Sequence, residues 1–116
     1  MARAPTTADV FNAIAEPRRR DIVQLLAGRD GRPVSELVRE MKLPQPAVSK
    51  HLGVLRAVGL VSVEKLGQQR IYRLNPKELK PVHDWVKLFE RFWTNQVDRI
   101  AERAERLARE RGAKPG

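Results

Sequence analysis

A chain of 116 residues is long enough to bury one hydrophobic core but short for two independent domains. A formal net charge of +9 combined with a hydrophobic fraction of 41% describes a folded basic domain rather than a disordered basic tail, and such a domain favours a polyanionic partner. The absence of cysteine excludes disulfides, thiolate metal sites and a cysteine nucleophile.

The N-terminal stretch MARAPTTADVFNAIAEP has no apolar segment of signal-peptide length. No uncharged apolar run elsewhere reaches the length needed to cross a bilayer. We therefore expect a soluble, cytoplasmic protein without a membrane partner.

Two short helices are expected first. Asp9 or Thr7 can cap a helix over residues 10–14. Pro17 suits the first turn of a second helix, PRRRDIVQLLAG, which is expected to end at Gly28. The apolar residues of this second helix share one face: Ile22, Leu25 and Leu26.

Residues from about 34 to 60 have the spacing of a helix-turn-helix. After the turn cluster RDGRP, a third short helix starts at Val34 or Ser35 and ends at Leu43 and Pro44. Its expected buried residues are Leu37, Val38 and Met41. Pro46 falls in the first turn of the next helix, so a tight turn joins the two.

The helix that follows has two chemically different sides. Val48, Leu52 and Leu55 share one apolar stripe. The other side is small, polar and basic, with no acid: Gln45, Pro46, Ser49, Lys50, Gly53, Arg56 and Ala57. A DNA major groove requires this chemistry, because small residues allow close approach while amides, hydroxyls and cations meet base edges and phosphates. His51 lies between the two sides, so a packing role and a direct DNA contact both remain open.

The segment LVSVEKLGQQRIYRLNP after Gly59 predicts a two-stranded hairpin over about residues 61–75, because its residues alternate around a turn at Gly67 to Arg70. Lys65, Arg70 and Arg73 decorate this hairpin. Its polar tip is suited to a minor groove or to backbone phosphates, and a plain surface hairpin is the alternative.

Positive charge is concentrated in residues 42–77. This segment carries seven Lys and Arg residues against one acid, Glu64, and so accounts for six of the nine excess charges. The basic residues are Lys42, Lys50, Arg56, Lys65, Arg70, Arg73 and Lys77. A merely solvated face is possible, but this concentration favours a binding surface.

A long helix is expected from about residue 76 to 111, starting near Asn75 and Pro76. Steps of three and four residues give one stripe, formed by Val82, Val86, Phe89, Trp93, Val97, Ile100, Ala104 and Leu107 and widened by Trp85, Leu88 and Phe92. A small domain cannot cover a helix of about 45 Å, so part of the stripe should face a second chain.

Three stretches together carry a family resemblance: FNAIAEPRRRDIVQLL, VSELVREMKLPQPAVSKHLGVLRAVGLV and GQQRIYRLNP. Across about residues 10–97 the chain resembles the ArsR/SmtB family of small winged-helix transcriptional repressors. The resemblance implies a mainly α fold with a small β-hairpin wing, in a single domain over residues 1–116. It also implies a homodimer on a palindromic operator, with the recognition helix in the major groove, the wing at the flanking minor groove and the terminal helices at the dimer interface.

The candidate DNA contacts fall into three groups. Gln45, Ser49 and Lys50 are assigned to base edges, with His51 as a further candidate. Lys42 and Arg56 are assigned to phosphates. The wing contributes Arg70 and Tyr72. Candidate dimer contacts are Val82, Trp85, Val86, Phe89, Phe92, Trp93, Val97 and Ile100.

No metal or cofactor is expected. Metal sensors of the family use cysteine pairs or carboxylate and histidine sets on the last helix, and this sequence departs from both patterns. His83 with Asp84 offers too few ligands for zinc, unless two copies combine across a dimer. The aromatic group of the last helix predicts core or dimer interface, with an apolar effector pocket as the alternative, so an effector stays open.

Three functions compete. A sequence-specific DNA-binding repressor is favoured. The alternative is a non-specific basic nucleic-acid-binding protein of the same fold, although Tyr72 is the only aromatic residue in the basic segment that could stack on bases. We do not expect an enzyme, because the only serines are Ser35, Ser49 and Ser62 and no glycine-rich phosphate loop or catalytic group accompanies them.

Overall fold

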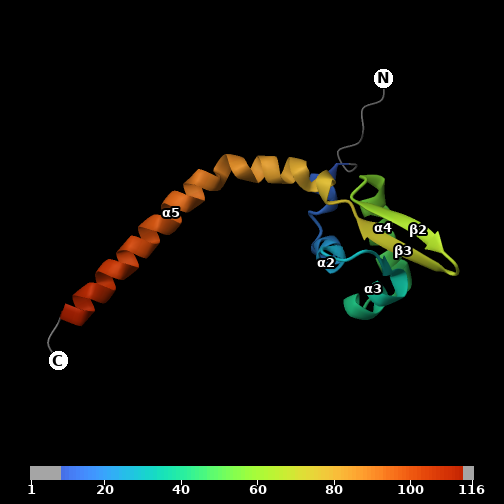
Figure 1. The fold of residues 1–116 in the computed structure, drawn as a ribbon, viewed down its shortest axis with the longest axis horizontal. Helices are drawn as coiled ribbons and strands as arrows, with labels where there is room; N and C mark the ends of the chain where they lie inside the picture. Colours follow the sequence, from blue (N-terminus) through green and yellow to red (C-terminus); the bar gives the residue numbers. More distant parts are fainter. Residues whose placement is uncertain (1–8, 114–116) are drawn as a thin grey trace, which may run out of the picture. The chain divides into compact units, whose positions relative to one another are not determined.

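The computed structural model describes residues 9–113, and their side chains except those of residues 97, 112 and 113 (Figure 1). The chain forms two compact units that divide between Val82 and His83. The first unit holds a helical core with a small sheet, and the second consists of the remainder of the last helix. Among the described residues no helix is long and apolar enough to cross a membrane.

Helices α1 (Val10–Ala13) and α2 (Pro17–Leu26) form where the sequence predicts them. Asp9 caps α1, because its side chain accepts a hydrogen bond of 2.7 Å from the backbone N–H of Asn12. Thr7, the other candidate cap, lies outside the described residues. Helix α2 begins with Pro17 in its first turn and ends two residues before the predicted Gly28.

Two arginines lock the corner between α1 and α2. The Arg19 guanidinium donates to the carbonyl oxygen of Ala13. The Arg20 guanidinium donates to the carbonyl oxygens of Ile14 and Ala15, at 2.8 and 3.0 Å. These donors satisfy carbonyls that the end of a short helix leaves without intrahelical partners.

The predicted helix-turn-helix is confirmed as α3 (Val34–Met41) and α4 (Gln45–Ala57). The turn between them opens at Lys42, which has φ 56° and ψ 39° in the left-handed region. This conformation ends α3 and redirects the chain towards Pro44, which precedes the first residue of α4.

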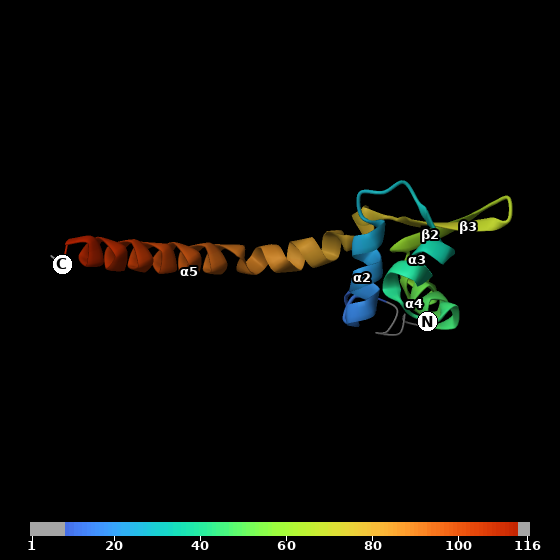
Figure 2. The same ribbon diagram turned by 90° about the horizontal axis from the view of Figure 1, so that it is seen from below.

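The hairpin is confirmed as β2 (Val61–Leu66) and β3 (Gln69–Leu74), antiparallel, with Val61 opposite Leu74 and Leu66 opposite Gln69. This register leaves a two-residue turn, shorter than the predicted one. A third strand, β1 (Arg32–Pro33), pairs with the other edge of β3, so the sheet order is β1-β3-β2. Figure 2 shows the hairpin turn projecting beyond the helices of this unit.

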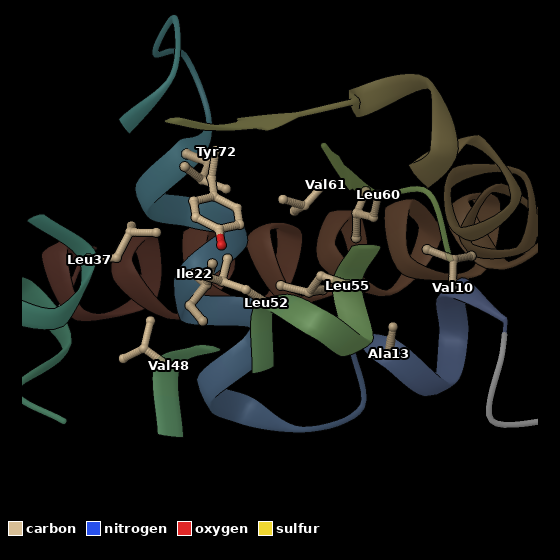
Figure 3. Close-up of a cluster of buried hydrophobic side chains, with 11 residues drawn as sticks. Val10, Ala13, Ile22, Leu37, Val48, Leu52, Leu55, Leu60, Val61 and Tyr72 are labelled. Atoms are coloured by element: carbon tan, nitrogen blue, oxygen red, sulfur yellow. The ribbon is translucent and has the colours of Figure 1, made fainter. Parts of the chain in front are cut away.

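The core of the first unit lies between the helices and the inner face of the sheet (Figure 3). The three stripe residues of α4 are buried as predicted: Val48, Leu52 and Leu55 are 0–1% exposed. They pack with buried residues from α1, α2, α3, the sheet and the turn before β2: Val10, Ala13, Ile22, Leu26, Leu37, Leu60, Val61 and Tyr72.

A buried arginine ties β1 to α3. Arg32 is 3% exposed, and its guanidinium donates two hydrogen bonds to the carboxylate of Glu40 and one of 3.3 Å to the carbonyl oxygen of Leu25. Its Nε lies 3.6 Å from Oε2 of Glu36. The hydrogen bonds from Arg32 lower the pKa of the Glu40 carboxyl, and the same bonds raise the pKa of Arg32.

From Pro76 to Ala113 the chain is helical. A 3-10 turn, η2 (Pro76–Leu79), leads into α5 (Lys80–Ala113). Val82 is partly buried and packs against the core of the first unit. From His83 to Arg111, every side chain that the structure describes is exposed except that of Val86, which is partly buried. The second unit therefore has no core of its own.

Replacing Gly31 tests the close approach of the turn before β1 to the sheet. Gly31 has φ +92°, and an added Cβ would lie 2.6 Å from Cγ2 of Ile71. Gly28 is a matched control, because it has φ +73° and nothing within 4 Å of its added Cβ. Backbone strain alone costs Gly28→Ala about 1 kcal/mol, and the clash adds about 1–3 kcal/mol in Gly31→Ala. Equal urea-unfolding free energies for the two variants would contradict this close contact.

Acidification tests the Arg32–Glu40 contact. Because the pKa of Glu40 is lowered in the folded state, its contribution to stability is present above the pKa of unfolded glutamate and is lost as the pH falls through the folded pKa. We expect the free energy of unfolding of the wild type to fall more steeply than that of Glu40→Gln between about pH 5 and about pH 3. Glu110→Gln on α5 is the control and should follow the wild type. Parallel curves for the wild type and Glu40→Gln would show that the contact is absent in solution.

Candidate nucleic-acid interface

The outward side of α4 carries four of the predicted contact residues. Burial of the apolar stripe turns Gln45, Ser49, Lys50 and Arg56 towards solvent, and all four side chains are exposed. The helix contains no acidic residue along its length. Gly53 lies on the same side, and nothing comes within 4 Å of a Cβ placed there, so a ligand can approach the backbone closely.

The wing brings distant residues next to α4. A hollow of about 320 Å³ is lined both by Gln45 at the start of α4 and by Arg70 on β3. A second hollow of about 530 Å³ lies between the later part of α4 and β2, with Arg56 on one wall and Ser62 on the other. Both hollows join α4 to the hairpin of β2 and β3, so polar residues of the two elements lie close to each other.

Two cations are cross-strand neighbours near the wing tip. Lys65 and Arg70 are directly opposite each other across β2 and β3, and both are exposed. Like charges in this arrangement destabilise a hairpin. The pair therefore concentrates positive charge at the hairpin end, where a nearby anion would relieve the repulsion.

The basic residues in the segment 42–77 differ in whether they form ion pairs. Arg73 forms ion pairs with two carboxylates: Nη1 lies 2.6 Å from Oε1 of Glu64 and Nε lies 3.5 Å from Oδ1 of Asp30. The hydrogen bond to Glu64 raises the pKa of Arg73. By contrast, within the described part of the chain the remaining basic residues of this surface make no ion pair: Lys42, Lys50, Arg56, Lys65 and Arg70.

His51 lies on the inner edge of α4. Its side chain is 16% exposed, and its Nδ1 is 3.6 Å from Oε2 of Glu16. Of the two roles that the sequence left open, this contact supports a packing role within the domain.

The prediction that Tyr72 contacts DNA from the wing is wrong for its side chain. Tyr72 is 5% exposed, and its ring points towards Ile22 and Leu52 in the core (Figure 3). Arg70 lies two residues earlier on the same face of β3 but is exposed, because it is close to the hairpin turn. Strand alternation places Arg70 and Tyr72 on the same face of β3. It does not show at which residue of the strand the core ends.

One hollow adds a residue that the sequence did not single out as a contact, Ser35 at the start of α3. Gln68 and Gln69, from the tip that the sequence predicts to be polar, line the same hollow with Gln45 and Arg70. What the sequence lacked was the docking of the tip beside the start of α3.

The predicted dimer contacts lie on α5. Large apolar side chains are exposed there: Trp85, Leu88, Phe89, Phe92, Trp93, Ile100 and Leu107. The rings of Trp85 and Phe89 meet edge to face at 5.2 Å, and the Arg91 guanidinium lies 5.4 Å from the ring centre of Phe92. The side chain of Val97 lies outside the described part of the structure.

No three potential metal-ligating side chains converge within the described residues. His83, at the start of the second unit, is exposed. A single chain therefore offers no assembled zinc site among these residues.

Two helices joined by a tight turn, an acid-free outward face on the second helix and an adjacent antiparallel hairpin define a winged helix-turn-helix DNA-binding protein. The Helix-turn-helix domain family matches residues 14–64.

Comparisons with individual proteins specify the class further. The HTH-type transcriptional regulator Rv2034 of Mycobacterium tuberculosis is 36% identical over 86% of this chain and 88% of that protein. The transcriptional repressor SdpR of Bacillus subtilis is 32% identical over 70% of this chain and 89% of that protein. The solved structure of an ArsR-like transcriptional regulator from Rhodococcus sp. RHA1 matches with a TM-score of 0.62 and 30% identity, over 83% of this chain and 87% of that one. The chain belongs to the ArsR/SmtB family of transcriptional regulators.

Proposed function

We propose that this chain is a homodimeric repressor that occupies a two-fold symmetric operator in double-stranded DNA. The observation that carries the proposal is the exposed, acid-free side of α4 beside a wing whose tip carries two opposed cations. A DNA-binding module needs both features, because the major groove admits one helix and the flanking phosphates attract cations. Repression follows where the operator overlaps a promoter, and the relative SdpR is named a transcriptional repressor.

The surface residues divide by the contacts they are suited to make. Gln45, Ser49 and Lys50 project from the first two turns of α4, where their amide, hydroxyl and ammonium groups can meet base edges. Cations at three other points of the surface are assigned to phosphates: Lys42 in the turn, Arg56 at the end of α4 and Arg70 on the wing.

The partner that we assign to the apolar face of α5 is a second copy of the chain. Val86, Trp93, Ile100 and Leu107 recur every seven residues, which is the period of two helices packed along a common seam. Trp93 and Ile100 are 53% and 65% exposed, and a contiguous face of this kind marks a protein contact. Two-fold pairing would also place two α4 helices on a symmetric operator.

The experiment that tests the proposal measures binding of the purified protein to its own upstream DNA and to scrambled DNA across a salt series, with the mass of the bound species determined alongside. Tight binding of a dimer to the upstream DNA in excess competitor is expected. Equal affinity for both DNAs at every salt concentration would instead identify a non-specific basic nucleic-acid-binding protein.

Two substitutions on the DNA surface should have different effects. Lys50→Ala should lower affinity for the operator by about 1–3 kcal/mol with little change on scrambled DNA, because it removes a base contact. Arg70→Ala should weaken binding to both DNAs and make the slope of log K against log salt shallower by about one, because it removes a phosphate contact. Fluorescence anisotropy titrations measure both.

Arg109→Ala is the matched control for these titrations. It removes the same charge from an exposed position on α5, and its binding curves should follow the wild type. Unchanged binding in both Lys50→Ala and Arg70→Ala would remove the proposed docking face.

A charge placed in the apolar seam of α5 should separate the dimer. Ile100→Glu should raise the dimer dissociation constant by about 10–100-fold, because it places a charge in a desolvated contact. Asn95→Glu adds the same charge about 140° around the helix from Ile100 and should leave the dimer intact. Sedimentation equilibrium measures both constants, and a dimer equally stable in both variants would show that this face is not the interface.

A further inference from the structure

Two polar atoms from distant parts of the chain are buried against each other at the back of α4. Nδ1 of His51 and Oε2 of Glu16 are 3.6 Å apart. Both atoms are buried, and neither has a hydrogen-bond partner within the described part of the chain. Thirty-five positions separate the two residues in the sequence, so only the tertiary fold brings them together.

Glu16 is held in place by its backbone. It precedes the first residue of α2, and its carbonyl oxygen accepts hydrogen bonds of 3.1 and 3.3 Å from the backbone N–H groups of Arg19 and Arg20. The side chains of the same two arginines bind the carbonyls at the end of α1. The corner that carries the Glu16 carboxylate is thus held by backbone and side-chain hydrogen bonds.

The chemistry of the two atoms decides which of them carries a hydrogen. A carboxylate oxygen can only accept a hydrogen bond. A neutral imidazole carries a hydrogen on one ring nitrogen, which donates, while the other nitrogen accepts. Were Nδ1 of His51 the bare nitrogen, two lone pairs would face each other in a buried place, and both atoms would stay unsatisfied. A hydrogen on Nδ1 satisfies both with a displacement of a few tenths of an ångström, into normal hydrogen-bond range.

We propose that Glu16 is a positioning residue for the recognition helix: its buried oxygen accepts a hydrogen bond from Nδ1–H of His51 and thereby holds the middle of α4 against the corner between α1 and α2. His51 follows Lys50 directly in the chain, so holding His51 against the α1–α2 corner also holds the turn that presents Ser49 and Lys50. This inference rests on the DNA-binding function proposed above. It assigns to Glu16, which lies outside the basic surface, an effect on sequence discrimination.

Substitutions of Glu16 separate this role from a simple effect of charge. Removal of an acid from a protein that binds a polyanion should by itself strengthen binding to any DNA. We expect Glu16→Ala instead to lower the ratio of operator to scrambled-DNA affinity about tenfold, because α4 loses its anchor. Glu16→Gln keeps an acceptor oxygen and should retain a ratio within about twofold of the wild type. All variants are compared well below their melting temperatures.

Asp21→Ala is the matched control, because it removes an acid from the exposed surface of α2. It should keep the wild-type ratio. An unchanged ratio in Glu16→Ala, or an equal loss in Glu16→Ala and Glu16→Gln, would overturn the proposal.

A second measurement is independent of DNA. Nitrogen-15 NMR reports which imidazole nitrogen carries the hydrogen, and only His51 and His83 contribute, so His83→Gln assigns the signals. At a pH where both rings give the spectrum of neutral imidazole, we expect the wild type and Glu16→Gln to carry the hydrogen on Nδ1 of His51. Hydrogen on Nε2 in the wild type would overturn the inference, even for a protein that binds no operator. The Nδ1–H form in a wild type that does not discriminate between DNAs would instead contradict the proposed function alone.

Discussion

The burial of Val48, Leu52 and Leu55 is the contact on which the rest of the structure depends. Complete burial of such side chains contributes about 1.5–3 kcal/mol each, and together they determine the roll of α4 about its axis. Once the roll is set, the polar and basic side of the helix has to face solvent. The turn at Lys42, the capped corner of α1 and α2 and the sheet all serve to enclose that stripe. The exposed, acid-free side of α4 is therefore a consequence of how the core packs.

The second constraint is the distribution of charge. Counting residues overstates the cationic surface, because Arg73 belongs to the basic segment yet lies against Glu64 and Asp30. Arg32 is likewise enclosed by Glu36 and Glu40. Four acids therefore contact Arg32 or Arg73 and not a cation of α4: Asp30, Glu36, Glu40 and Glu64. Lys65 and Arg70 lie opposite each other at the wing tip, and their repulsion is a local conflict of the kind expected at a binding site.

Helix α5 presents a different problem. Its apolar face is longer than any surface in its own unit can cover, because that unit is a single helix. Such a face is stable in water only when a partner covers it. In the homodimer that we propose, a second copy of the chain would supply the same face, and the two-fold symmetry of that contact would pair the two α4 helices.

The sequence by itself determined the helices, the hairpin and the two sides of α4. Each of these rests on local physics: Asp9 caps a helix, prolines open helices, and apolar residues recur with the period of the element that buries them. Periodicity also revealed the stripe of α5, although not what covers it. These features could be predicted because the residues that determine each of them are close together in the sequence.

Only the tertiary structure decided the features that join distant segments. Strand β1 has two residues, too few for alternation to be visible, and exists because Arg32 and Pro33 pair with β3. Tyr72 belongs to the core because the helices lie beneath that part of β3 and not beneath Arg70. Glu16 and His51 meet only after α2 and α4 have packed. The physical reason is common to all three. Burial and pairing between distant segments depend on which elements pack against each other, and no local pattern in the sequence specifies that packing.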